Sequence, residues 1–383
     1  MLVIIGVICV LFYIMFMSYY VEHYKSADHP QQEEVYYLEE LTRRYGASAT
    51  SEQIVDFIGE KRGPLLLEAE EYFKTMPIFS EAGVYSYDDY KTLQNELWER
   101  EVTQAEAEAY RMLNTEECGC LGFWLSALRN LEEYTGVRAR LVDNPASFHY
   151  DLNEKEQQRF FGLLENGEDH SILSYWTYTY TESYLKFFSV LLTLSLLVLL
   201  APLLTKDRLA RIHYLQYSAM HGRKIIRGQF IAILISAFLL TTLLLLVFGG
   251  IFSTGGTGVF WDNAINSDFN LGVYTVFNLT YGQWVMAGVG LLYLLSLSAA
   301  AIAFIISRFS ENLVTLIMKL IPVFAALAIL SFNVFGEMFG LFNPLYSIFK
   351  VFGTEVYICG ALALLALALT RLATRKEKQI DVL

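Results

Sequence analysis

Six long apolar stretches constrain this chain more than any other feature of its sequence. A helix needs about 20 mostly apolar residues to cross the roughly 30 Å of bilayer hydrocarbon. Apolar residues make up 54% of the 383 residues. They gather in stretches at about 2–21, 186–206, 229–252, 283–306, 313–335 and 356–370. We therefore predict an all-α membrane protein with six transmembrane helices.

Three of these stretches have individual features. The first has neither a basic start nor a small-residue cleavage site, so we expect an uncleaved anchor rather than a signal peptide. The fourth is rich in Gly, Ala and Ser, which let helices approach closely, so we expect it to pack inside the bundle. The sixth has only 15 uncharged residues. It must thin the bilayer, snorkel its flanking Arg371, or follow a segment that enters the membrane without crossing it.

The residues between the first and second apolar stretches differ sharply in charge from the remainder of the chain. Residues 21–185 carry 32 Asp and Glu and 14 Lys and Arg, a net charge of −18, whereas the other residues have a net charge of +6. Such asymmetry is expected when one part is a solvated domain and the other lies in lipid. A basic nucleic-acid footprint is absent from the soluble part, so we expect no nucleic-acid partner. We predict a separate domain over 22–185, large enough to bury its own core.

The apolar spacing in this domain is mainly helical. Positions three and four residues apart predict helices over 33–45, 51–60, 64–76, 86–114, 119–134 and 153–164. Ser51, Ser86 and Asn153 stand where N-caps belong, Pro64 suits a first helical position, and Gly63 and Gly136 suit helix ends. Residues 172–181 fit either a strand or an aromatic belt at the membrane surface, and we favour the belt.

Basic residues predict the orientation, because Lys and Arg near span ends mark the cytoplasmic side. The loop 205–228 carries six basic residues and one acid, whereas the loop 253–282 has no Lys or Arg. The tail 372–383 is basic again. We therefore expect a multi-pass protein of the cell membrane with both termini cytoplasmic. The first helix would cover 1–21, the extracytoplasmic domain 22–185, and five further helices 186–371.

Signs of chemistry are few. The sequence has no phosphate-binding Gly-x-x-x-x-Gly-Lys-Ser/Thr loop and no hydrolase elbow, so we expect neither an ATPase nor another enzyme in this chain, and we name no catalytic residue. Cys118, Cys120 and the histidines 29, 149 and 170 lack the spacing of metal ligands, and we name no metal site. Lys319 is the one charge that we place within a span. It fits a snorkelling side chain, which we favour, or a charge on a transport pathway.

The basic loop is the most informative segment. Between Asp207 and Gly228, Leu209, Ile212, Leu215 and Tyr217 can share one helical face, with basic groups on the others. An amphipathic basic helix of this kind binds anionic headgroups or a partner protein.

The residues Tyr214-Leu215-Gln216-Tyr217-Ser218-Ala219-Met220-His221-Gly222-Arg223-Lys224, placed between two spans, resemble a known element. It is the cytoplasmic coupling helix of type-2 ABC transporter permeases, in the subgroup with a large external domain between the first two spans. The layout of spans and loops is similar as well. The segment 336–353, with Asn343-Pro344, resembles the short re-entrant helices at the outer face of that family. Its members commonly begin with an amphipathic helix, whereas Met1 here leads straight into the first stretch, so we expect that helix to be missing or encoded upstream.

The resemblance implies a permease subunit of an ATP-driven exporter for an amphipathic peptide, antibiotic or lipid. Two permease subunits, identical or paralogous, would sit on a cytoplasmic ABC ATPase dimer that docks helix 212–223 and binds ATP and Mg, and no cofactor is expected in this chain. The implied coupling residues are Tyr214, Leu215, Tyr217, Ser218, Met220, Gly222, Arg223 and Lys224.

The alternative hypothesis is a membrane-anchored sensor or scaffold whose external domain binds a ligand or peptide. The acidity of that domain fits a solvated surface, and it also fits a site for cationic peptides. Five spans after the domain and a small-residue helix are more than an anchor requires, so we favour the exporter.

Overall fold

The computed structural model describes residues 2–18, 20, 30–97, 99–143, 153–165, 171–209, 222–267, 269–270 and 274–378. It divides the chain into two compact units. The membrane unit comprises Met1–His23, Thr179–Gly258 and Val273–Leu383, and the acidic domain comprises Tyr24–Tyr178 and Val259–Gly272. The regular elements of the described residues are all helices, so the predicted all-α class is confirmed.

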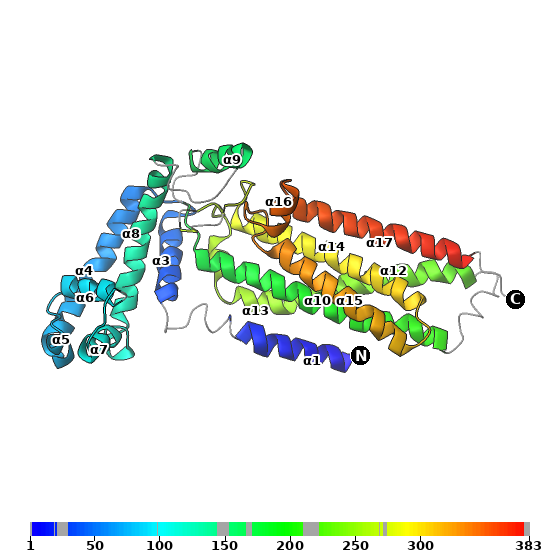
Figure 1. Cartoon of the computed structure of the whole chain (residues 1–383), viewed down its shortest axis with the longest axis horizontal. Helices are drawn as coiled ribbons and strands as arrows, with labels where there is room; N and C mark the ends of the chain where they lie inside the picture. Colours follow the sequence, from blue (N-terminus) through cyan, green and yellow to red (C-terminus); the bar gives the residue numbers. More distant parts are fainter. Residues whose placement is uncertain are drawn as a thin grey trace. The chain divides into compact units, whose positions relative to one another are not determined.

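Five helices of the described chain are long and apolar enough to cross a membrane. They are α10 (Tyr175–Leu209), α12 (Gly222–Leu244), α14 (Tyr281–Arg308), α15 (Leu313–Phe335) and α17 (Thr354–Lys378). In the membrane unit α14 packs against α12, α15 and α17 (Figure 1). The protein is thus a multi-pass membrane protein by the length and composition of its helices.

Helix α14 packs inside the described bundle together with α10, as its small residues predict. In the most apolar stretch of α14, 56% of the residues are buried, against 11% in the corresponding stretch of α15. The side chains that face its neighbours include Gly288, Ser296 and a run of buried alanines from Ala299 to Ala301. Small side chains let the neighbouring backbones come close, which favours dispersion contacts within lipid.

The first apolar helix is shorter than the other five. Helix α1 (Leu2–Phe12) continues through a π-helical turn, Tyr13–Met17, and its apolar part runs from Val3 to Met17. Helix α12 likewise continues through a π-helical turn, Leu245–Gly249, into α13 (Gly250–Ser253). The ring of Phe12 lies 5.0 Å from that of Phe248 in this turn and 6.3 Å from that of Phe188 in α10. Aromatic contacts of this kind join α1 to the bundle.

Two spans are longer than the sequence prediction. The second begins at Tyr175 rather than after Lys186, because Glu182 and Lys186 form an i,i+4 ion pair and the helix carries both charges. The aromatic residues of 175–180 therefore lie on a helix and not on a strand. The sixth span runs over Thr354–Arg375, not Val356 to Thr370, because the side chain of Glu355 is buried and the helix continues past Arg371.

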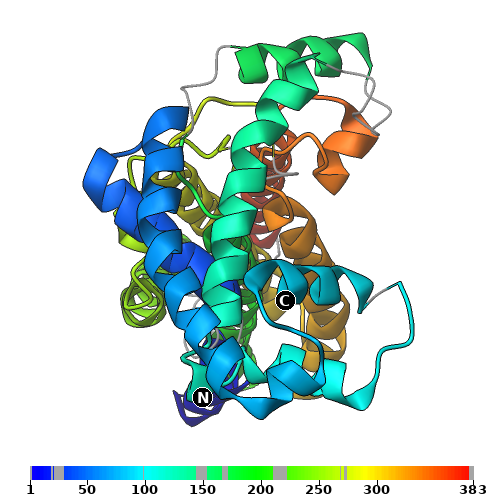
Figure 2. The same cartoon turned by 90° about the vertical axis from the view of Figure 1, so that its left-hand side faces the viewer.

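The acidic domain is built around a long helix, α8 (Leu121–Asp143). Helices α3 (Pro30–Tyr45) and α4 (Ser51–Thr75) pack beside it, as Figure 2 shows, and α9 (Glu154–Glu165) contacts it as well. The short helices α5 (Pro77–Glu81), α6 (Tyr87–Glu96) and α7 (Gln104–Met112) close a core around Phe73, Phe79 and Leu113. Burial of such apolar side chains stabilises the domain.

Helix boundaries in this domain differ from the prediction at three places. Helix α4 runs unbroken through Gly63 and Pro64, and its N-cap is Thr50, not Ser51. The predicted helix 86–114 is two helices, because Thr103 starts α7 with a capping box of its own, whereas Ser86 is the N-cap as predicted. Helix α8 continues through Gly136 to Asp143. Contacts of α8 with α3, α4 and α9 outweigh the local cost of one glycine.

The acidic domain also contains a segment from far along the chain. Residues 259–270 follow α13, yet Asn263 donates hydrogen bonds to Thr42 Oγ1 and to the carbonyl of Ile172. Ser171 Oγ donates to the carbonyl of Ala264 at 3.0 Å, and the N–H of Tyr175 donates to the carbonyl of Phe269. The compact unit that contains most of the domain predicted over 22–185 comprises Tyr24–Tyr178 and also Val259–Gly272.

Candidate functional site

The clearest concentration of buried polar groups in the membrane unit surrounds residues 336–343, here called the 336–343 turn, between α15 and the short helix α16 (Pro344–Phe349). Asn343, which is fully buried, is the N-cap of α16 and accepts from the N–H groups of Leu345 and Tyr346. Its amide group donates to the carbonyls of Asn333 and Gly336. Asn343 therefore joins the end of α15 to the start of α16, and Pro344 is the first residue of α16.

Three side chains from three helices bind successive residues of this turn. Glu182 Oε1 of α10 accepts from the N–H of Glu337 at 2.8 Å. Trp284 Nε1 of α14 donates to the carbonyl of Met338 at 3.0 Å. Glu355 Oε1 of α17 accepts from the N–H of Phe339 at 3.0 Å. The turn therefore connects the ends of α10, α14 and α17 (labelled in Figure 1).

Charge in this region is partly compensated. Lys186 forms an ion pair with Glu182, whose side chain is 8% exposed. Burial, and then the negative charge of Glu182, raise the pKa of Glu337, and the ammonium group of Lys186 opposes them. Glu355 is 1% exposed, and its Oε2 atom has no hydrogen-bond partner among the described residues. A buried carboxylate oxygen without a partner is costly and needs a reason.

The sequence prediction identified Asn343 and Pro344 but missed Glu182, Lys186, Trp284 and Glu355. Glu182 and Glu355 stand at span ends, where carboxylates are ordinarily solvated, so nothing in the local pattern predicted their burial. The i,i+4 spacing of Glu182 and Lys186 was the available signal, since such a pair can be carried into a span.

Lys319, the possible pathway charge, lies on the exposed side of α15. Its Nζ donates to the carbonyl of Phe309 at 2.7 Å. Phe309 is the C-cap residue of α14, where unpaired carbonyls carry partial negative charge. The ammonium group therefore completes the end of the neighbouring helix.

The predicted coupling helix 212–223 falls almost entirely outside the described residues. The positions that lie outside the described residues include Tyr214, Leu215, Tyr217, Ser218 and Met220. Gly222 opens α12, and Arg223 and Lys224 follow it in the same helix. The described chain therefore fixes the two helices that flank this loop, α10 ending at Leu209 and α12 beginning at Gly222.

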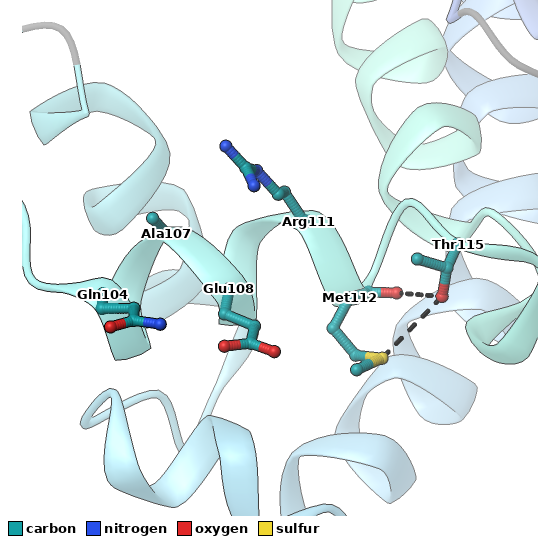
Figure 3. A pocket seen from close by; sticks show the side chains of 6 residues that line it. All are labelled: Gln104, Ala107, Glu108, Arg111, Met112 and Thr115. Atoms are coloured by element: carbon teal, nitrogen blue, oxygen red, sulfur yellow. Dashed lines mark hydrogen bonds between the residues drawn. The ribbon is translucent and has the colours of Figure 1, made fainter.

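A hollow of about 530 Å³ lies beside α7 in the acidic domain (Figure 3). Its walls carry one base and one acid among small and apolar groups. They are Gln104, Ala107, Glu108, Arg111, Met112 and Thr115. Thr115 Oγ1 donates to the carbonyl of Met112 at 2.7 Å, so this hydroxyl serves the helix end. Side chains of both signs on an open surface do not select a ligand class.

Cys118 belongs to the apolar core of the acidic domain. Cys118 is buried and donates to Met76 Sδ at 3.6 Å, and burial raises the pKa of its thiol to about 11. A thiol with a raised pKa is a poor nucleophile and a poor metal ligand at neutral pH. Within the described ranges, no three His, Cys, Asp or Glu side chains are grouped as metal ligands.

The chain matches no known family model, no curated protein and no solved structure. Its function therefore has to be argued from the arrangement of its helices, loops and buried polar groups.

Proposed function

We propose that this chain is the permease subunit of an ATP-driven ABC exporter. Six spans, with α1 as the first, place both termini in the cytoplasm and the acidic domain outside the cell. A separate ATPase dimer docks on the 212–223 helix and supplies ATP and Mg, and a second permease subunit completes the translocation path. The cargo is an amphipathic peptide, antibiotic or lipid.

The observation that carries this proposal is the hydrogen bonding of 259–270 within the acidic domain. Two segments of one folded domain lie on the same side of a membrane. Since α10 and α12 are each long enough for one crossing, the loop between them belongs on the opposite side. That loop and the adjoining ends of α10 and α12 carry the six basic residues of 205–228, which favours the cytoplasm.

Helix α1 supports a sixth span, although it is short. Its 15 apolar residues reach about 22 Å at helical rise, and a short span is accommodated by local thinning of the bilayer. The ring of Phe16 lies 4.7 Å from that of Phe187 in α10, so α1 runs against a longer span. The five later spans put the basic tail on the side opposite the acidic domain in any case, and a crossing by α1 puts the start of the chain on the same side as that tail.

Co-purification tests the proposal directly. Deletion of 212–223 should abolish capture of an ATP-hydrolysing P-loop protein while the chain still inserts into membranes, because the coupling helix supplies the docking contact. Deletion of 379–383 is the control and should leave capture intact. A tagged full-length chain that brings down no ATPase activity from native membranes, or a 212–223 deletion that retains it, would overturn the exporter.

The same test separates the exporter from a sensor or scaffold. A sensor needs no ATPase, and the hollow beside α7 would then be its ligand site. In an exporter, a single Cys placed at Ser218 should change its reactivity with a membrane-permeant thiol reagent when nucleotide is added to the assembled complex. In a sensor, nucleotide has no effect on that reactivity.

A further inference from the structure

The 336–343 turn is bound at three consecutive residues by three different helices, and the bonds share one short stretch of backbone. We propose that this turn is a releasable latch, closed in this structure, that locks together the ends of α10, α14 and α17, and that its two amide–carboxylate bonds open together. Its use as the gate of a transport path rests on the proposed function, whereas the latch itself does not.

The backbone of the latch is held in an unfavourable conformation. Glu337 has φ 47° and Phe339 has φ 64°, in the left-handed region that non-glycine residues rarely adopt. The N–H groups of these same two residues donate to Glu182 and Glu355. Strained backbone of this kind persists only where surrounding contacts hold it, and it clusters at switch regions. The two carboxylates therefore hold the strain.

The two carboxylates differ in how far they are satisfied. Glu182 forms an ion pair with Lys186. Lys186 is therefore a positioning residue for the hydrogen bond between Glu182 and the N–H of Glu337. Glu355 has a buried Oε2 atom without a hydrogen-bond partner, and no ion pair of Glu355 occurs in the described part of the chain. Closure thus leaves one acceptor unused, and opening would expose it to a new partner or to water. A closed state with such a cost is suited to switching.

Cooperative opening follows from the geometry. Trp284 fixes the carbonyl of Met338, which lies between the two bonded N–H groups. Residues 274–276 also bind the latch: the N–H of Val276 donates to the carbonyl of Phe339 at 2.7 Å, and the N–H of Leu341 donates to the carbonyl of Tyr274 at 3.0 Å. If Phe339 leaves the left-handed region, the peptide planes on both sides rotate. The plane of Met338 and Phe339 is joined to Glu337 through Met338 alone, so its rotation turns the left-handed Glu337 and takes the Glu337 amide out of alignment with Glu182.

Asn343 provides the fixed end of the latch. Its side chain binds the carbonyls of Asn333 and Gly336 on one side and caps α16 on the other. The movement is therefore confined to residues 337–341, with α15 and α16 held together at Asn343. A local opening needs no unfolding of a span, which is the behaviour of a low-stability unit inside a stable fold.

Amide hydrogen exchange with single-residue resolution tests the latch on the permease chain alone in lipid nanodiscs. Glu355→Leu removes one acceptor and should speed exchange at both Phe339 and Glu337 by about tenfold or more, since a hydrogen bond to a carboxylate contributes that much. Glu355→Gln keeps an acceptor oxygen and should give a smaller effect at the same two amides. Glu311→Gln, at the exposed α14–α15 loop, is the control and should change neither.

Glu182→Leu removes the other acceptor and provides the reciprocal measurement: it should speed exchange at Phe339, although Phe339 is bound to Glu355. Acceleration confined to the amide that lost its own partner would overturn the latch, because the bonds would then be independent. Equal acceleration in the middle of α14 would overturn it as well, because Glu355 would then support the whole bundle. The measurement uses no ATPase, so loss of the exporter proposal through failed co-purification leaves this outcome unaffected.

Discussion

Buried carboxylates set the behaviour of the acidic domain at the scale of single residues. Glu33 and Glu34 of α3 are 3% and 2% exposed, and each has an oxygen without a hydrogen-bond partner in the described chain. Burial raises the pKa of each carboxyl from 4.5 to about 7, and the hydrogen bond from Asn130 opposes this shift at Glu34 only in part. Both groups therefore change charge near neutral pH when the domain is folded.

Glu34→Gln should make the acidic domain less sensitive to pH. A folded pKa above the unfolded value means that the folded state binds more protons between pH 4.5 and about 7, so stability falls as pH rises through this window. The wild-type domain should be more stable at pH 5 than at pH 8 by up to about 3 kcal/mol for this group. The variant should gain stability at pH 8 relative to wild type.

Thermal unfolding of the solubilised chain at pH 5 and pH 8 measures this effect. Glu52→Gln, at an exposed position in the first turn of α4, is the matched control and should leave the pH difference as in wild type. If Glu34→Gln and wild type lose the same stability between pH 5 and pH 8, Glu34 is not the group responsible.

At the scale of elements, α14 offers two glycines with opposite surroundings. A side chain at Gly288 would meet Leu185 of α10 at 2.8 Å and Met338 at 3.4 Å, whereas Gly290 has nothing within 4 Å. Gly288→Leu should destabilise the membrane unit by about 1–3 kcal/mol, because overpacking a close helix contact forces both helices to shift. Gly290→Leu should be neutral or slightly stabilising, because leucine is the better helix former.

Thermal denaturation of the two variants in one lipid or detergent provides the comparison. Equal midpoints for Gly288→Leu and Gly290→Leu would show that the approach of α10 to α14 is not close enough to matter. Since both substitutions add the same apolar side chain to one helix, differences in hydrophobicity cancel.

Sequence patterns predicted the elements whose signal is local. The span 313–335 coincides with α15, and the small residues of 283–306 predicted that α14 packs inside the bundle. Helix 64–76 was wrong in its start because packing carries α4 through Gly63 and Pro64, and the sixth span was too short because Glu355 is buried. The 336–343 turn depends on contacts between distant parts of the chain, such as that of the Glu182 side chain with the N–H of Glu337, 155 positions away, and no single-sequence pattern reports such pairs.

For the whole molecule, the two-unit division makes a topological prediction. The acidic domain includes Asp262 as well as Glu68 of α4, both exposed, so single cysteines at these positions should react together with a membrane-impermeant thiol reagent on intact cells. A cysteine at Ser218 should stay unreactive until the cells are opened, because one apolar helix separates 205–228 from the domain.

The background for this labelling is a chain with Cys9, Cys118, Cys120 and Cys359 replaced by serine. Reaction of the Ser218 cysteine under the conditions that label Asp262 would place the basic loop beside the acidic domain and remove the basis of the exporter. Labelling of the Ser218 cysteine on intact cells, with the cysteines at Asp262 and Glu68 labelled only after permeabilisation, would show that the chain has the inverted orientation.

The 259–270 segment limits how the acidic domain can be altered. Its flanking residues belong to the membrane unit, yet Asn263 lies fully within the other unit and is 1% exposed. The acidic domain therefore cannot be excised or exchanged at a single pair of junctions. A chimaera in which 24–178 alone is exchanged keeps a 259–270 segment that does not match the new domain. Any related chain with a different domain must therefore have changed both segments together.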